Sequence, residues 1–223
     1  MLLAIPDVLS ADELRRVREG VHQAKYDSGN LTAGDGSRSR KNNLQISDSD
    51  PSLPELRRVV TDALMRHPMM QFLVMPKHVM PLVFNCYKQG MYYEDHVDFA
   101  LVGGSQKLRT DLSMTLFLSA AAEYDGGELV FELESGPRSV KLEQGQAIIY
   151  PSGTIHRVDP VTRGARYAVV TTIQSYVRDD EKRALLADVL RLARWVQDSA
   201  PQSEEARLAN KLHANLLRMW ADL

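Results

Sequence analysis

The chain has 223 residues, of which 44% are hydrophobic, and its formal net charge at pH 7 is −2. A chain of this size and composition can bury a substantial core, and its near-neutral charge argues against a nucleic-acid-binding or strongly basic membrane-surface protein. The single cysteine, Cys86, excludes an intramolecular disulfide framework and any cysteine-rich zinc or iron–sulfur site.

The N-terminal segment "MLLAIPDVLSADELRR" does not have the features of a signal peptide. It lacks a basic region at its start, and its apolar run is interrupted at Pro6 and Asp7. No stretch of the sequence approaches the ~18 consecutive apolar residues of a membrane-spanning helix. We therefore expect a soluble, cytoplasmic protein whose partners include neither a membrane nor a nucleic acid.

The first part of the chain is predicted to be mainly helical. Residues 1–5 suggest a short strand, and Ser10 followed by Glu13 forms a capping box that opens an amphipathic helix in "SADELRRVREGVHQA". The polar, glycine-rich segment 27–43 predicts a mobile loop. Apolar residues at helical spacing predict a second helix over 53–67.

The remainder of the chain changes character twice. From residue 72 to residue 176, short apolar runs such as "HVMPLVFNCY" and "DGGELVFEL" alternate with turn signals, which predicts an all-β sandwich or barrel. After residue 178 the pattern is helical again, and Pro201 separates two amphipathic helices. We expect one domain over 1–177, with its core at about 78–176, and a helical extension over 178–223.

The stretch "YKQGMYYEDHVDF" contains two side chains that suit a metal ion, His96 and Asp98. Alternate residues of a β-strand share a face, so this imidazole and carboxylate would project together; a structural hydrogen-bonded pair is the alternative. His156 follows the run "QAIIYP" in the same β-region and adds a second imidazole. Two imidazoles and a carboxylate can hold non-haem Fe(II) and leave positions open for a cosubstrate and dioxygen, although zinc accepts the same ligands.

Arg166 begins an apolar strand ten positions after His156, beyond the turn "DPVTRGA". A hairpin of this length would bring the arginine back beside the histidine strand. A buried guanidinium needs a partner, and its planar fork matches a carboxylate through two hydrogen bonds. The alternatives are an edge arginine that faces solvent and one that pairs with a glutamate.

Taken in order, these residues form a recognisable motif. They are Tyr87, Gly90, Tyr93, His96 and Asp98, then "GGELVF" at 126–131, then His156 and Arg166. The ordered set resembles the Fe(II)/2-oxoglutarate dioxygenases of the prolyl 4-hydroxylase type. The wider chain is similar to the bacterial PKHD-type hydroxylases, also called the PiuC family, with supporting stretches "KNNLQ" at 41–45 and "GQAIIYPSGTIHRVDPVTRGARY" at 145–167.

The resemblance implies a fold and a chemistry. The fold would be mainly β with flanking helices, built on a double-stranded β-helix, or jelly-roll, core. His96, Asp98 and His156 would hold Fe(II), and Arg166 would bind the distal carboxylate of 2-oxoglutarate. The enzyme would use O2 to hydroxylate its substrate with release of succinate and CO2, would depend on ascorbate as a reductant, and would act in the bacterial cytoplasm.

A further hydroxyl group is expected to bind the cosubstrate. Tyr87 matches the tyrosine that hydrogen-bonds 2-oxoglutarate in related enzymes. On the strand "LFLS", where several relatives carry another tyrosine, this chain has Phe117. The hydroxyl would then come from Tyr87, Ser113 or Thr115.

Candidate substrate-side residues lie beside the predicted loop and in the motif. Asn43 and Gln45 belong to a polar cluster with Lys41 and Asn42, and Tyr93 precedes the metal motif. Binding groups often lie on loops over a rigid scaffold, although a solvated loop end is the alternative. The substrate itself stays open: a peptidyl proline or lysine, a free amino acid and a small metabolite are all compatible with this site.

Two other functions are compatible with the ligand set alone. One is a cupin-like metalloprotein that performs hydrolysis or isomerisation with zinc or manganese, and the other is a non-catalytic iron or oxygen sensor. The two C-terminal helices must bury their apolar stripes. Packing on the β-core is the first expectation, and a homo-oligomer that uses part of these stripes is the alternative.

Overall fold

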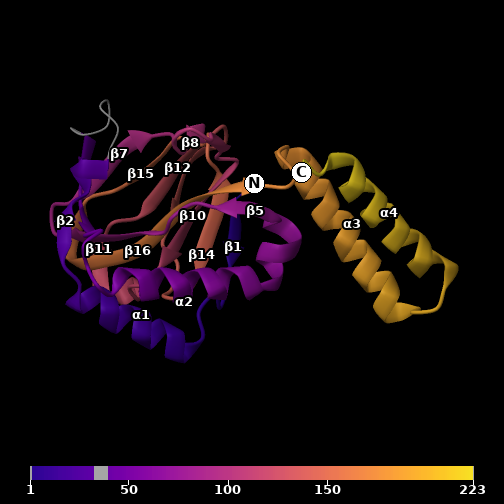
Figure 1. Ribbon diagram of the computed structural model, residues 1–223, viewed down its shortest axis with the longest axis horizontal. Coiled ribbons are helices and arrows are strands. Elements are labelled where there is room, and N and C mark those ends of the chain that lie inside the picture. Colours follow the sequence, from indigo (N-terminus) through magenta and orange to yellow (C-terminus); the bar gives the residue numbers. More distant parts are fainter. Residues whose placement is uncertain (1, 33–39, 223) are drawn as a thin grey trace.

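Two large β-sheets, the small two-stranded sheet β8–β9 and two pairs of α-helices make up the computed structural model, which describes residues 2–32 and 40–222 (Figure 1). The strands are β1 (Leu3–Ile5), β2 (Tyr26–Ser28), β3 (Lys41–Asn42), β4 (Leu44–Ile46), β5 (Pro76–Val79), β6 (Val83–Lys88), β7 (Tyr92–His96), β8 (Leu101–Val102), β9 (Leu108–Arg109), β10 (Leu112–Phe117), β11 (Tyr124–Gly126), β12 (Leu129–Leu133), β13 (Gly136–Val140), β14 (Ala147–Pro151), β15 (His156–Val158) and β16 (Val161–Ser175). The helices are α1 (Ala11–Gln23), α2 (Leu53–Arg66), α3 (Asp180–Ser199) and α4 (Glu204–Trp220).

The predicted elements are found, with one change near the N-terminus. The segment 27–43 was expected to be a loop, but its described part contains the end of strand β2, the whole of strand β3 and a 3-10 turn over Gly29–Thr32. Residues 33–39 lie outside the described residues. The short strands form because each pairs with a neighbour, β2 with β4 and β3 with β7.

The two sheets are antiparallel and share a core. The larger has the order β1–β14–β10–β16–β6–β4–β2, with β5 and β11 also paired to β16, and the smaller has the order β13–β12–β15–β7–β3. Tyr87 and Phe117 of the larger sheet pack in one buried cluster with Phe131 and Val158 of the smaller. The arrangement is the mainly β fold with flanking helices that the sequence predicted.

Successive residues of the central strands face opposite sides of the larger sheet. In β10, Leu112 and Leu116 belong to the core beneath α1 and α2, whereas Thr115 and Phe117 face the smaller sheet. All of β10 is buried because both of its faces are covered. The inner face, between the sheets, is therefore where side chains from both sheets meet.

Helices α1 and α2 lie along the outer face of the larger sheet (Figure 1). The capping box of α1 is confirmed: the Ser10 N–H donates to Glu13 Oε2 at 2.9 Å, and the Glu13 N–H donates to Ser10 Oγ at 3.4 Å. Val17 of α1 and Leu56 of α2 join one apolar cluster with the strands. Burial of these apolar faces stabilises helices that would be marginal alone.

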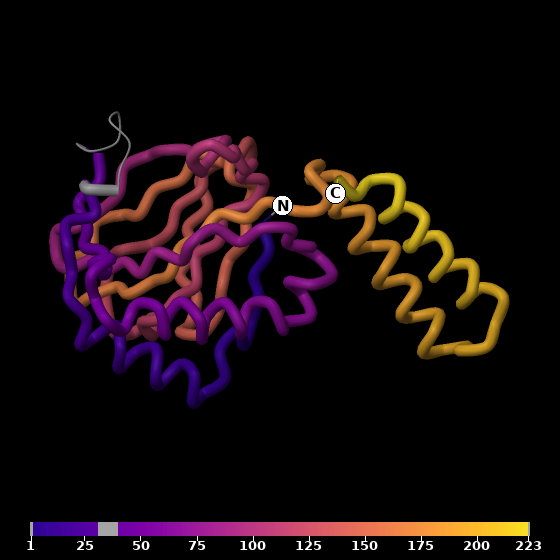
Figure 2. Tube along the Cα trace, viewed as in Figure 1, coloured from indigo at the N-terminus to yellow at the C-terminus, as the bar shows by residue number. Residues whose placement is uncertain are grey.

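Helices α3 and α4 form an antiparallel hairpin that projects from the β-core, and the C-terminal end of the chain returns to its base (Figure 2). Beside the core, the Arg194 guanidinium lies 4.5 Å from the ring centroid of Phe72. At its C-terminal end, the Asp222 N–H donates to the Tyr176 carbonyl at 2.7 Å, and Arg109 Nη1 donates to Asp222 Oδ2 at 2.9 Å.

The expectation that these helices pack on the β-core is wrong for most of their length. They pack on each other, and several of their large apolar side chains are exposed to solvent. These are Leu185, Leu192, Trp195, Leu208, Leu212 and Met219. The physical reason is that, among the described residues, the contacts of the hairpin with the core are concentrated near the π-helix Met70–Val74 and around the cluster of Met75, Val177 and Leu186.

Replacement of Ser10 by alanine tests whether the N-cap hydrogen bond stabilises α1. The loss of its side-chain acceptor should lower the free energy of unfolding by about 1 kcal/mol, as for other N-cap substitutions. Urea denaturation followed by circular dichroism measures the change, with the exposed Ser105→Ala as a control that should lie within about 0.5 kcal/mol of the parent. Equal stability of Ser10→Ala and the parent would contradict the capping role.

Candidate metal centre

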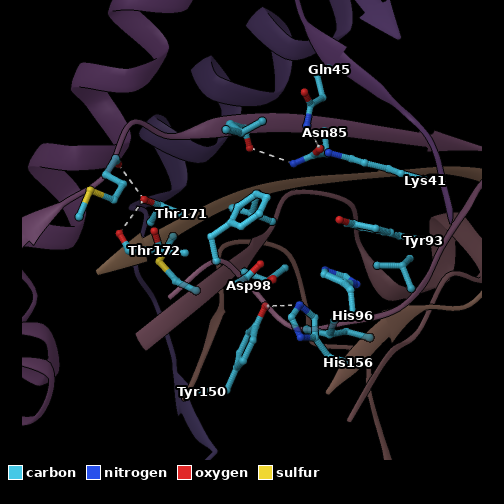
Figure 3. A pocket seen from close by; sticks show the side chains of 18 of the residues that line it. Lys41, Gln45, Asn85, Tyr93, His96, Asp98, Tyr150, His156, Thr171 and Thr172 are labelled. Carbon is cyan, nitrogen blue, oxygen red and sulfur yellow. Dashed lines mark hydrogen bonds between the residues drawn. The ribbon is translucent and has the colours of Figure 1, made fainter. Parts of the chain in front are cut away.

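His96, Asp98 and His156 converge on the inner face. Each offers one ligand atom, and these atoms lie within 4.8 Å of one another. The two imidazole ring centroids are 4.2 Å apart, and Figure 3 shows the three side chains around a common space. Two neutral imidazoles and one carboxylate are a donor set for a divalent transition metal and suit Fe(II). The sequence predicted this convergence.

The pairing of β7 with β15 places the histidines. His96 lies directly opposite His156 in this antiparallel pair, so both side chains leave the smaller sheet on the same face. Asp98 lies beyond the strand, which ends at His96, and its backbone N–H donates to the Ser152 carbonyl at 3.2 Å. The prediction that His96 and Asp98 share one strand face is therefore wrong, although the carboxylate reaches the same place from the following loop.

Backbone carbonyls fix the tautomer of both imidazoles. Nδ1 of His96 lies 2.8 Å from the Glu94 carbonyl oxygen, and Nδ1 of His156 lies 2.9 Å from the Thr154 carbonyl oxygen. A carbonyl oxygen only accepts, so each Nδ1 carries the proton and donates. Nε2 is left as the ligand atom of each ring. The Tyr150 hydroxyl lies 3.3 Å from His156 Nε2 and faces the same space.

The environment of His96 favours its neutral form. Burial, together with the neighbouring His156, lowers the pKa of His96 to about 4. An imidazole binds a metal only when it is neutral, so this ring is ready for a metal at neutral pH. The Tyr93 ring stacks on His96 with centroids 3.6 Å apart and planes at 16°, which holds the imidazole in position.

Two serine hydroxyls support the carboxylate. Ser113 Oγ donates to Asp98 Oδ2 at 2.5 Å, and the hydroxyls of Ser113 and Ser152 lie 2.8 Å apart. Ser113 is buried in β10. The sequence suggested Ser113 as a hydroxyl for the cosubstrate, but the structure directs it to Asp98. Such hydrogen bonds orient a metal-binding carboxylate and tune its basicity.

Arg166 reaches the site from the opposite sheet. The predicted hairpin between the strands of His156 and Arg166 is wrong, because β15 pairs with β12 and β7 in the smaller sheet while β16 belongs to the larger. The chain crosses from one sheet to the other between Val158 and Val161. The crossing makes Arg166 face the histidines across the interior instead of beside them.

The Arg166 guanidinium is buried and lacks an anionic partner in the described part of the chain. The residue is 1% exposed, its Nε and Nη2 atoms have no hydrogen-bond partner there, and its Cζ lies 5.3 Å from the Tyr87 ring centroid and 5.2 Å from that of Phe117. An unsatisfied buried guanidinium is costly. Its planar fork therefore fits a site that receives a carboxylate.

Two tyrosines surround this guanidinium. Tyr87 lies opposite Arg166 in the pairing of β6 with β16, and burial raises the pKa of Tyr87 to about 12, so its hydroxyl stays protonated as a donor. Tyr124, which the sequence analysis missed, is fully buried, and its hydroxyl has no partner within the described residues. Burial raises the pKa of Tyr124, and the nearby Arg166 opposes the rise.

Gly127 leaves the space that this group of side chains occupies. Its φ is +67°, in the region that favours glycine, and a Cβ there would lie 3.2 Å from Arg166 Cδ and 3.2 Å from Tyr124 Cε2. Glycine at this position of the "GGEL" turn therefore has a structural role.

The triad and Arg166 line one cavity of about 280 Å³ between the sheets (Figure 3). Gln45 and Tyr93, both predicted on the substrate side, also line it. Asn43 is not among the described lining residues: it is buried, and its Nδ2 donates to Asn85 Oδ1 at 2.8 Å, the same oxygen that Gln45 Nε2 reaches at 3.0 Å. Asn43 therefore lies behind the residues that line the cavity.

Comparisons with known proteins agree with this geometry. The family model of the 2OG-Fe(II) oxygenase superfamily matches residues 82–174. A PKHD-type hydroxylase of Acaryochloris marina is 42% identical, and the PKHD-type hydroxylase PiuC of Pseudomonas aeruginosa is 40% identical, each with 100% of both chains covered. The chain belongs to the PKHD-type hydroxylases.

Solved structures show the same fold at low identity. A Pseudomonas putida prolyl-4-hydroxylase is 18% identical with a TM-score of 0.53, and covers 78% of this chain and 92% of its own. HygX of Streptomyces hygroscopicus, solved with nickel and 2-oxoglutarate bound, is 12% identical with a TM-score of 0.52, and covers 78% of this chain and 82% of its own. These neighbours confirm the predicted jelly-roll core.

Membership of this family settles the reaction class. This hydroxylase is an oxidoreductase that depends on Fe(II), 2-oxoglutarate and O2, as the sequence predicted. Within the described residues, no helix is long and apolar enough to cross a membrane.

Replacement of Ser113 by alanine tests the support of Asp98. Loss of the hydrogen bond should weaken metal binding by about 10-fold or more, because groups that orient a metal ligand have effects of this size. Anaerobic Co(II) titration followed by absorption measures the dissociation constant. Ser119→Ala, which removes another buried serine hydroxyl that bonds to the Ala165 carbonyl, is the matched control. Unchanged affinity in Ser113→Ala would show that Asp98 needs no such support.

Proposed function

We propose that His96, Asp98 and His156 hold Fe(II) and that Arg166 binds the far carboxylate of 2-oxoglutarate. The observation that carries this proposal is the buried Arg166 guanidinium, whose Nε and Nη2 have no hydrogen-bond partner among the described residues and which lines the same cavity as the triad. With iron, 2-oxoglutarate and O2 bound, the site supplies the oxidising chemistry that hydroxylates a substrate and releases succinate and CO2. The chain's own residues bind, orient and shield these reactants.

The hydroxyl donors around Arg166 are proposed to fix the orientation of the cosubstrate. Tyr87 lies next to Arg166 and stays protonated, and Tyr124 supplies a second buried hydroxyl in place of the one that Phe117 lacks. Thr115 lines the cavity and is a third candidate. Apolar side chains such as Leu129 and Val158 line the same space and exclude water from it.

The substrate is proposed to be a peptide or small molecule that undergoes hydroxylation. The fold is compatible with both, because a prolyl hydroxylase solved with a peptide fragment of hypoxia inducible factor and HygX solved with hygromycin B share it. Ascorbate is the proposed reductant that restores Fe(II). The cytoplasm is the proposed compartment, since its reducing conditions suit a ferrous enzyme.

Substitution of a metal ligand and of the arginine should have different effects. His96→Ala should lose metal binding and succinate formation, whereas Arg166→Ala should keep the metal and raise KM for 2-oxoglutarate by about 10²-fold, as expected for loss of a buried charge-assisted pair. Succinate release and anaerobic metal titration measure the two effects.

The exposed Arg191→Ala on α3 is the control for loss of an arginine and should match the parent. Equal 2-oxoglutarate binding and turnover in all three variants and the parent would exclude the assignment. A cupin-like hydrolase or isomerase would instead show no 2-oxoglutarate dependence, and a sensor would bind iron without releasing succinate.

We also propose that the extension over 178–223 mediates self-association. Trp195 of α3 is 66% exposed, and Leu192 and Leu208 are also largely exposed on this projecting hairpin. Clustered apolar side chains on a surface are typical of protein–protein interfaces. A second copy of the chain is the proposed partner, because the same hairpin then supplies both faces of a symmetric contact.

A double substitution tests this interface. Leu192→Glu with Trp195→Glu should convert an oligomer to a monomer, since two charges would be desolvated in the contact. Sedimentation velocity over a range of concentrations measures the state, and Gln202→Glu in the exposed turn between the helices is the control. A parent protein that is monomeric at every concentration would refute the proposal.

A further inference from the structure

We propose that Lys41 binds an anionic group of the prime substrate, and that this substrate is a small carboxylate with an apolar body. The inference rests on the proposed function, because it assigns the part of the cavity that iron and 2-oxoglutarate would leave to the substrate. Lys41 lines the same cavity as the triad and Arg166.

Lys41 lies close to the metal centre but on its own wall. It is in β3, opposite Tyr93 in the pairing of β3 with β7, and its Nζ is 5.3 Å from the Tyr93 ring centroid. Tyr93 in turn stacks on His96. Figure 3 shows the Lys41 side chain extending toward Gln45 and Asn85, with the Tyr93 ring between it and His96. A group bound by Lys41 would therefore lie in the same cavity as the metal ligands, across the Tyr93 ring from His96.

Among the described residues that line the cavity, Arg166 and Lys41 are the basic side chains other than histidine, and they belong to different sheets. Arg166 is in β16 of the larger sheet, packed against the rings of Tyr87 and Phe117. Lys41 is in β3, the last strand in the order of the smaller sheet. A single dicarboxylate bound at Arg166 and at the metal has both of its charged ends assigned, so Lys41 has a separate role.

The charge of the cavity favours one more anion. Among the described residues that line it, Lys41 and Arg166 each carry a positive charge and Asp98 a negative one, so the lining has a net charge of +1. Fe(II) adds two positive charges and 2-oxoglutarate adds two negative ones, which leaves the loaded site with the same excess. A substrate carboxylate would neutralise it in an environment where charge is expensive.

Burial at this wall has a measurable consequence for the lysine. Desolvation lowers the pKa of Lys41 to about 8, and Asp98 partly opposes this effect. An anion bound next to the ammonium group would favour its charged form. Lysine also suits this role because its flexible stem presents a compact charge.

Exposed apolar side chains lie next to the metal ligands in the sequence, and they suit the apolar part of the substrate. Val97 and Phe99 flank Asp98, line the cavity, and are 52% and 62% exposed. Ile155, next to His156 in the chain, is 48% exposed. Large apolar side chains that are exposed beside a cavity with few charges indicate an apolar contact surface for a ligand.

Matched pairs of acids and amides test this inference. The probes are 3-phenylpropionate with 3-phenylpropionamide and N-acetyl-leucine with N-acetyl-leucinamide, together with 3-phenylpropyl phosphate. Each is titrated by calorimetry into the protein loaded with Mn(II) and 2-oxoglutarate without oxygen. The acids should bind about 10-fold or more tightly than their amides, as expected for a charge-assisted contact. The ratio should fall to about one in Lys41→Met and persist in Lys41→Arg.

The controls separate this inference from the proposed function. Lys211→Met on the exposed face of α4 should behave as the parent, and Lys41→Met should bind 2-oxoglutarate as tightly as the parent. Three results would overturn the role of Lys41. The acids and amides could bind the parent equally, 3-phenylpropyl phosphate could bind more tightly than both acids, or neither acid could bind at millimolar concentration. Weaker 2-oxoglutarate binding in Lys41→Met would also overturn it. A parent that binds no 2-oxoglutarate would instead refute the function.

Discussion

The site depends on the register of one strand pair. His96 and His156 meet because β7 and β15 pair with these two residues opposite each other. Side chains alternate along a strand, so a shift of one residue would turn an imidazole to the opposite face and remove it from the interior. The apolar residues of the smaller sheet fix this register, since Phe131 and Val158 must stay in the core between the sheets.

The second constraint is the crossing of the chain from β15 to β16. It brings Arg166 into the interior from the sheet that faces the histidines, although only a few residues separate the two strands. The metal ligands and the guanidinium therefore lie on opposite walls of one cavity, which leaves space for a ligand that contacts both. Among the described residues, the Nε and Nη2 atoms of the buried Arg166 guanidinium have no hydrogen-bond partner, which lowers the stability of the ligand-free protein. A ligand that binds only the folded state offsets that loss.

The sequence predicted the elements and the triad because their signals are local or ordered. The capping box at Ser10 and Glu13 is a short-range pattern, and the histidine and aspartate motif is specific by its spacing. The sheet to which Arg166 belongs could not be predicted, because a turn of a given length can join two strands of one sheet or strands of two different sheets. The side chains alone do not distinguish these outcomes.

Residues whose role depends on a distant neighbour were harder to place. Tyr124 and Tyr150 carry no motif, and they become candidates only when the sheets bring them near Arg166 and His156. A signal existed for Tyr150: it alternates with Ile149, which faces the helices, so Tyr150 must face the interior. Asn43 illustrates the reverse case, because its polar side chain supports the buried Asn85 amide instead of a ligand.

The positions of the site residues in the sheets indicate where substrate specificity can change without loss of the reaction. His96, His156 and Arg166 are fixed by strands that have a neighbour on each side, where a substitution disturbs packing on two sides. Lys41 lies in β3, a strand of two residues at the end of the smaller sheet, and Phe99 lies in the loop after the metal motif. Side chains at such positions can be replaced with little effect on the core. Specificity is therefore expected at this edge, around a reactive centre that the fold holds constant.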